Sequence, residues 1–157
     1  MNRRTIFLSL STFLTFSSAL ADHEVQNLKG FRSVCVNALV EIKDKEDENA
    51  AELIYNAIAD QLEDAGLAVA DNPCQNNGST ANRQLNLLYT FSSTPNGGAY
   101  LSQLEGWLQQ EGKYTRPLVW NDYIYGSPGK AETLNQLAED LATELTDNFL
   151  GNWEDSH

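Results

Sequence analysis

Carboxylates and histidines are the side chains of this 157-residue sequence that could support catalysis. Glu105 and Asp122 fall on two segments with the pattern of paired strands, and two carboxyl groups that share a cleft can hydrolyse glycosides. His23 and His157 lie near the two ends of the chain, where holding a metal ion or relaying a proton would need additional order. We therefore predict that the protein is not an enzyme, and a small hydrolase that uses Glu105 and Asp122 is the weakest alternative.

The densest acidic cluster, between Asp44 and Glu48, is the other candidate for ion binding. It lacks the glycine and the distal glutamate of an EF-hand loop. Acidic side chains at the start of a helix complement the helix dipole, so we expect the cluster to begin a helix with Asp44 as N-cap. No haem-attachment, Walker or dinucleotide motif is present. We predict no metal and no cofactor.

Residues 1–21 have the composition of a secretory signal peptide. Arg3 and Arg4 precede an apolar stretch at 6–16, and Ala19 and Ala21 are the small residues of a cleavage site. This stretch is shorter than the ~20 residues of a membrane span, and no later segment approaches that length. We predict cleavage after Ala21 and a soluble, periplasmic or secreted product without a transmembrane segment. Cleavage removes two of the ten basic residues and no acidic one, so the formal charge falls from −12 to −14.

The charge and the cysteines narrow the possible roles further. A chain this acidic is a poor ligand for nucleic acid, which is itself a polyanion. Cys35 and Cys74 are the only two cysteines, and in an oxidising compartment an even number favours a disulfide over two separate thiols, the alternative. The two cysteines are 39 residues apart. A disulfide that closes a loop of this length would contribute roughly 3–4 kcal/mol to stability.

Hydrophobic periodicity predicts one globular domain over residues 22–157. The expected elements are a strand at 31–42, a helix that ends near Gly66, strands at 84–92, 99–110 and 113–125, and a final helix that ends near Gly151. This order, β-α-β-β-β-α, predicts an α+β two-layer sandwich with two helices on one face of a mostly antiparallel four-stranded sheet. The first two strands could be parallel neighbours or enclose an inserted strand. The ends, 22–30 and 151–157, are expected to be loosely ordered.

The last two strands suggest an interaction surface. If Gln110 pairs with Lys113, Leu104 faces Val119 on the helix side, and the opposite face carries the large side chains. The predicted partner-binding residues on that face are Trp107, Tyr114, Arg116, Leu118 and Trp120. A slip of one residue would exchange the two faces and place the tryptophans in the core, which is the open alternative.

Four segments resemble small exported bacterial domains with the anticodon-binding-like fold. They are the strand Val34 to Ile42, the helix ending in Asp64-Ala65-Gly66-Leu67, the hairpin ending in Leu118-Val119-Trp120, and the helix running to Asn148-Phe149-Leu150. Such domains occur at the start of the TolB translocation protein and in curli-secretion and lipoprotein-assembly factors. The resemblance implies a non-enzymatic envelope protein that acts by contact with other proteins. This sequence lacks the lipid-attachment cysteine that many of them carry.

The leading expectation is therefore a soluble periplasmic adaptor or assembly factor that binds a protein partner. The alternative is a protein that binds a sugar or a lipid with the same aromatic surface. The sequence leaves the partner and the oligomeric state open.

Overall fold

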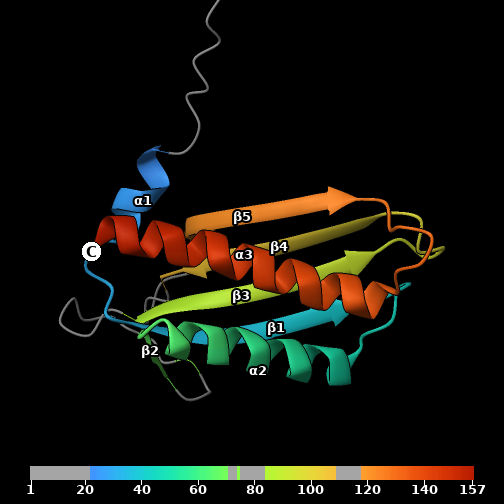
Figure 1. Ribbon diagram of the computed structural model, residues 1–157, viewed down its shortest axis with the longest axis horizontal. Coiled ribbons are helices and arrows are strands. Elements are labelled where there is room, and N and C mark those ends of the chain that lie inside the picture. The colour runs from blue at the N-terminus through green and yellow to red at the C-terminus, as the bar shows by residue number, and fades with distance from the viewer. Residues whose placement is uncertain (1–21, 71–73, 75–83, 109–117) are drawn as a thin grey trace, which may run out of the picture.

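The computed structural model describes residues 22–70, 74, 84–108 and 118–157. These residues form two layers, a five-stranded sheet and a pair of helices that run across one of its faces (Figure 1). The predicted α+β class and the order β-α-β-β-β-α are confirmed, with the addition of one short strand and one short helix.

The sheet is mixed and has five strands in the order β2-β1-β3-β4-β5, where a mostly antiparallel sheet of four strands was predicted. The strands are β1 (Ser33–Glu41), β2 (Ala68–Val69), β3 (Gln84–Ser93), β4 (Tyr100–Trp107) and β5 (Leu118–Gly126). β1 is parallel to both β2 and β3, whereas β3, β4 and β5 are antiparallel. The first two predicted strands correspond to β1 and β3. They are parallel neighbours, so the alternative with a strand inserted between them is wrong.

Helices α2 (Glu48–Asp64) and α3 (Leu134–Ser156) cover one face of this sheet. Each presents a stripe of buried side chains at three- and four-residue spacing, and the strands contribute alternate residues from below. The largest fully buried side chains are Trp120, Tyr89, Phe91 and Phe149. Both α2 and α3 lie on the same face, and no helix of the described residues lies on the opposite one (Figure 1).

Helix α2 begins three residues later than predicted. Asp47 is the N-cap, and its Oδ1 accepts from the Ala50 N–H at 3.0 Å. Asp44, the expected cap, has a φ of 59° and belongs to a tight turn that follows β1. The turn is closed by two backbone hydrogen bonds between Ile42 and Lys45, so helical geometry cannot start before it ends.

Both ends of the domain, expected to be loosely ordered, are helical. Helix α1 (Asp22–Leu28) packs against α3 and β5, with Leu28 fully buried. Helix α3 passes through Gly151, its expected end, and buries Trp153. His157 then lies with Nε2 2.9 Å from the Phe31 carbonyl oxygen. Burial of these large side chains supplies the free energy that orders both segments.

Candidate interaction surface

The face of the sheet opposite α2 and α3, here called the open face, carries most of the well-exposed large hydrophobic side chains of the described residues. The described residues include six large hydrophobic residues that are well exposed. Five belong to the open face, and we call them the open-face patch: Leu39, Leu101, Leu118, Tyr123 and Tyr125. The sixth, Leu53, lies on α2. Scattered exposed hydrophobic residues are ordinary, but a collection on one face is typical of an interaction site.

Cross-strand pairing places the members of the patch relative to one another. Leu101 is opposite Tyr125, and Gln103 is opposite Tyr123. The rings of Tyr123 and Tyr125 are nearly parallel, with centroids 6.3 Å apart, and the side chains are 54% and 73% exposed. Opposite residues in an antiparallel pair contact each other directly. Leu101, Tyr123 and Tyr125 therefore form an exposed apolar cluster at this corner of the sheet.

A hydrogen-bonded polar strip runs along β4 beside that corner. The Glu105 carboxylate accepts from the Trp107 Nε1–H at 2.9 Å and from the Gln103 amide. Both contacts join side chains two residues apart, which share one face of a strand. Trp107 itself is half-buried and lies opposite Leu118. The open face thus has apolar groups at both ends of β4 and a carboxylate between them.

The predicted hairpin register is wrong by three residues, and this changes the proposed site. Leu104 pairs with Asp122 instead of Val119, and Gly106 pairs with Trp120. An odd shift exchanges the faces of one strand relative to the other. Trp120 is consequently 1% exposed and packs edge-on against Phe149, with ring centroids 5.1 Å apart.

The predicted partner-binding residues therefore do not form one surface. Trp107 and Leu118 lie on the open face, and Trp120 belongs to the core. Tyr114 and Arg116 lie outside the described residues. Sequence reasoning missed Leu39, Leu101, Tyr123 and Tyr125 as members of one surface.

The two carboxylates of the hydrolase alternative lie on opposite faces of the sheet. Glu105 is on the open face, whereas Asp122 is opposite Leu104 on the helix side, where its Oδ2 accepts from the Asn148 amide at 2.8 Å. They cannot act on one substrate as a pair, so the expectation that they share a cleft is wrong.

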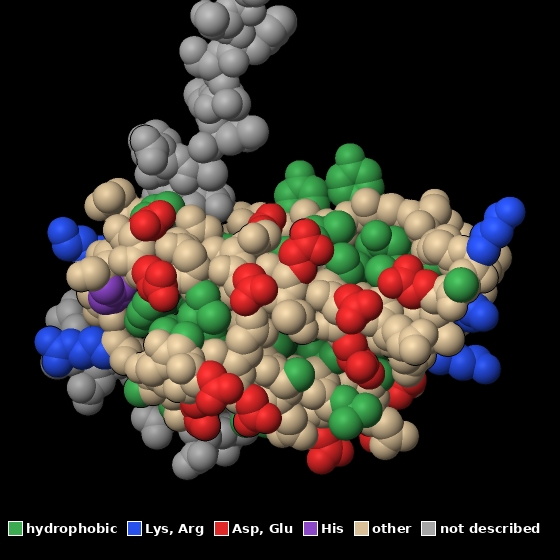
Figure 2. Space-filling view, viewed as in Figure 1, with side chains coloured by type: hydrophobic (Ala, Val, Ile, Leu, Met, Phe, Trp, Pro, Cys, Tyr) green, Lys and Arg blue, Asp and Glu red, His purple; other side chains and the backbone are tan. Residues whose placement is uncertain are grey.

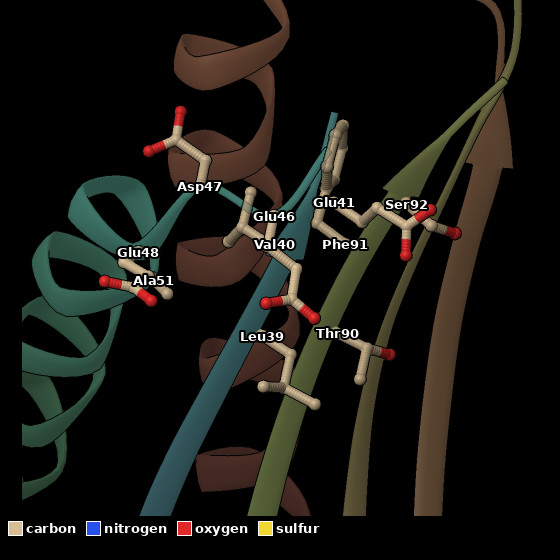
Figure 3. Close-up of a pocket in the computed structure, with 10 residues that line it drawn as sticks. All are labelled: Leu39, Val40, Glu41, Glu46, Asp47, Glu48, Ala51, Thr90, Phe91 and Ser92. Atoms are coloured by element: carbon tan, nitrogen blue, oxygen red, sulfur yellow. The ribbon is translucent and has the colours of Figure 1, made fainter. Parts of the chain in front are cut away.

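Two hollows border the open face and share Leu39. One, of about 450 Å³, lies over β1 and β3 and includes Leu88 and Trp107. The other, of about 230 Å³, lies between the end of β1 and the start of α2. Figure 3 shows its lining, with side chains from β1, β3 and the first turn of α2. Its apolar wall carries the carboxylates of Glu41, Glu46, Asp47 and Glu48.

The capping carboxylate in the second hollow is held in its charged form. The Ala50 N–H, followed by the Asn135 amide on α3, lowers the pKa of Asp47 below its ordinary value of 3.8. Hydrogen bonds to a carboxylate favour its ionised state. One side chain therefore begins α2 and also links it to the start of α3.

The disulfide between Cys35 and Cys74 is present, as predicted, with the Cα atoms 5.5 Å apart. Cys35 lies in the row of the open face that also contains Asn86 and Trp107. The Asn37 amide lies 3.1 Å from Cys74 Sγ. The bond therefore attaches residue 74 to one end of this face, and a disulfide is consistent with an extracytoplasmic protein.

Two further features concern the described part of the chain, namely its possible metal ligands and the apolarity of its helices. Within it, no group of three or more His, Cys, Asp or Glu side chains is placed to hold a metal ion. None of its helices combines the length and apolarity needed to span a bilayer.

The charged residues are distributed unevenly over the fold. No described helix or strand contains Lys or Arg, and the described basic residues all lie in connecting segments: Lys29, Arg32, Lys43, Lys45 and Lys130. On the helix side, acidic side chains spread over α2 and α3, while basic ones gather at the two ends of the molecule (Figure 2). The helix layer is thus strongly anionic.

Comparison with known proteins finds no matching protein family and no similar curated protein. Among solved structures, the chain is similar to PelC from Paraburkholderia phytofirmans, described as a dodecamer, with 17% identity and a TM-score of 0.45 over 74% of this chain and 86% of that one. It is also similar to an uncharacterized protein, with 13% identity and a TM-score of 0.37 over 83% and 95%. At TM-scores below 0.5 the likeness carries no functional conclusion, and the resemblance to anticodon-binding-like domains stays a prediction.

Proposed function

We propose that this protein is a non-enzymatic contact protein of the cell envelope, an adaptor or assembly factor that binds another protein through its open sheet face. The observation that carries the proposal is the concentration of exposed apolar side chains on the face that no described helix covers. An antiparallel sheet can leave one face in water, and that face is then ordinarily polar. The open-face patch departs from that rule.

The composition of the patch also supports protein binding. Binding hot spots are rich in tyrosine, tryptophan and arginine, because these side chains bury a large area and keep a polar group for hydrogen bonding. Tyr123 and Tyr125 are exposed, with their rings stacked, and Trp107 is half-buried opposite Leu118. The apolar groups of this face gain free energy when a partner removes them from water.

Site-specific crosslinking in the native host tests the proposal. A photoreactive amino acid at Tyr123 should give a discrete crosslinked protein, because that ring would lie inside the interface. The same amino acid at Leu53 on α2 is the matched control, since Leu53 is also an exposed hydrophobic residue. Equal crosslinking at both positions, or none at Tyr123, would contradict the proposal.

A small-molecule function is the second candidate, and the hollow beside Trp107 favours it. Its volume of about 450 Å³ and its lining by Leu39, Leu88 and Trp107 suit a sugar or an acyl chain. Thermal-shift screening separates the two candidates. A ligand that raises the melting temperature, with the effect lost in Trp107→Ala, would favour the pocket over a protein partner.

A further inference from the structure

The charge of the open face indicates what kind of protein segment it would bind. The described residues of this face include Glu41 and Glu105 and no basic residue. Glu105 lies between the apolar groups at the two ends of β4. The hollow shared through Leu39 adds further carboxylates beside β1. Any segment that covers this face must therefore supply apolar side chains for the apolar groups and positive charge for the carboxylates.

We infer that the occupant of the open face is a basic, extended segment of a partner protein, with Lys or Arg between apolar side chains. This inference rests on the proposed function. Leu101 and Trp107 are six residues apart on β4, which at 3.3–3.4 Å per residue is about 20 Å. A partner would place apolar side chains at these two ends and a cation near Glu105. Complementary charges give such a contact its specificity and its rate of association.

A second copy of this chain is a poor occupant of the same face. Its helices and strands contain no Lys or Arg in the described part, so two copies would bring carboxylates against carboxylates. Like charges across an interface oppose association. The chain also carries 22 acidic against 10 basic residues, so its overall charge repels another copy.

Binding of two designed peptides to the purified, disulfide-bonded protein tests the inference. One ten-residue peptide alternates leucine with arginine, and the other alternates leucine with glutamate. We expect fluorescence anisotropy to show binding of the arginine peptide only, weakening as NaCl screens the charges. Comparable binding of the two peptides would overturn the inference.

Matched variants locate the binding on the open face. Leu101→Ser with Tyr123→Ser should weaken binding by about tenfold, since both side chains are exposed apolar contacts. Glu105→Gln should weaken it about fivefold through loss of one charge. Leu53→Ser and Glu144→Gln, both on the helix layer, should change it less than about twofold. Equal losses from the helix variants would assign the binding to diffuse acidity and overturn the inference. Circular dichroism melts verify that each variant is folded.

Two further readouts separate failure of this inference from failure of the proposed function. If crosslinks form at Tyr123 but the partner segment they identify is neutral or acidic, the inference fails and the proposed function stands. Sedimentation equilibrium at low and high salt gives the oligomeric state. If the parent forms a stable oligomer and Leu101→Ser is monomeric, the open face binds a second copy of this chain. That result would also overturn the inference.

Discussion

A single phenol joins the two layers of the protein. Tyr89, on β3, is fully buried, and its hydroxyl donates to the Ala138 carbonyl oxygen on α3 at 2.7 Å. The Tyr89 hydroxyl oxygen also accepts from the Ser102 hydroxyl on β4 at 2.9 Å. Burial raises the pKa of Tyr89 well above its ordinary value of 10.0, against the opposite effect of Ser102. The hydroxyl thus stays neutral and fixes the height of α3 over the sheet.

Replacing Tyr89 with phenylalanine should lower the free energy of unfolding by about 1–2 kcal/mol, because two buried polar groups lose a partner. Because the folded-state pKa is raised, the contribution of the phenol is complete below pH 10 and is lost as the pH rises further. Urea unfolding at pH 7 and at alkaline pH measures both effects. Tyr125→Phe, at an exposed ring, is the control and should change stability by less than about 0.5 kcal/mol. A neutral Tyr89→Phe would contradict the role assigned to the hydroxyl.

At the scale of the elements, local patterns predicted the order of strands and helices, but they did not predict the hairpin register. Alternation and three- to four-residue spacing are properties of one segment, so β1, α2, β3 and α3 could be found. Register depends on the connection between two strands and on irregularities, and β4 pairs with β5 through a bulge at Gly106 and Trp107.

One signal for the register was present in the sequence. Gly106 lies within a strand, and a glycine there indicates a bulge or a close approach of another group. A Cβ added to Gly106 would lie 3.4 Å from the Trp120 Cβ and 3.2 Å from a Leu85 methyl group. The glycine therefore lets Leu85 and the Trp120 Cβ approach the β4 backbone closely on the helix side of the sheet.

The two tryptophans should respond differently to truncation. Trp120→Ala should destabilise the fold by about 3–5 kcal/mol, because it removes a buried indole and leaves a cavity beside Phe149. Trp107→Ala should cost roughly 1 kcal/mol, since the ring is only half-buried and donates one hydrogen bond. Urea unfolding with near-ultraviolet circular dichroism measures both. If Trp120→Ala proves unfolded, Trp120→Phe should still be clearly less stable than the parent. Equal effects of the two alanine variants would contradict the observed register.

The stability that the N-cap of α2 contributes should depend on pH in the acidic range. Because hydrogen bonds lower the pKa of Asp47, its contribution is complete above the ordinary value of 3.8 and is lost as the pH falls through the lowered value. Asp47→Ala should lower the melting temperature at pH 7 and remove part of the acid dependence. Asp47→Asn keeps a capping oxygen and should recover part of the loss. Asp44→Gly is the control, because glycine accepts the φ of 59° at that position. It should leave the acid dependence unchanged, and an equal loss of acid dependence in this variant would contradict the assignment of Asp47 as the cap.

At the scale of the whole molecule, the helices carry acidic residues, while the described basic residues lie in the connecting segments. Glu63 and Asp64 occupy the last turn of α2, and Glu154 and Asp155 lie near the end of α3, where the helix dipole favours cations. Both helices lie on the same face of the sheet, so their carboxylates face the same solvent layer (Figure 2). The carboxylates of the helix layer therefore repel one another, whereas the exposed apolar side chains of the described residues gather mainly on the other face.

This self-repulsion predicts that salt stabilises the protein. The Debye length falls from 30 Å at 0.01 M to about 8 Å at 0.15 M ionic strength, so NaCl should screen carboxylates on α2 from those on α3. We expect the free energy of unfolding to rise by about 1 kcal/mol over that range, an effect set by many weak pairs. Asp64→Lys should be more stable than the parent at low salt and gain less from NaCl, because it removes one repelling charge and complements the dipole. Urea unfolding at both concentrations measures the difference. A stability that is flat or falls with NaCl would show that the acidic layer is already compensated within the fold.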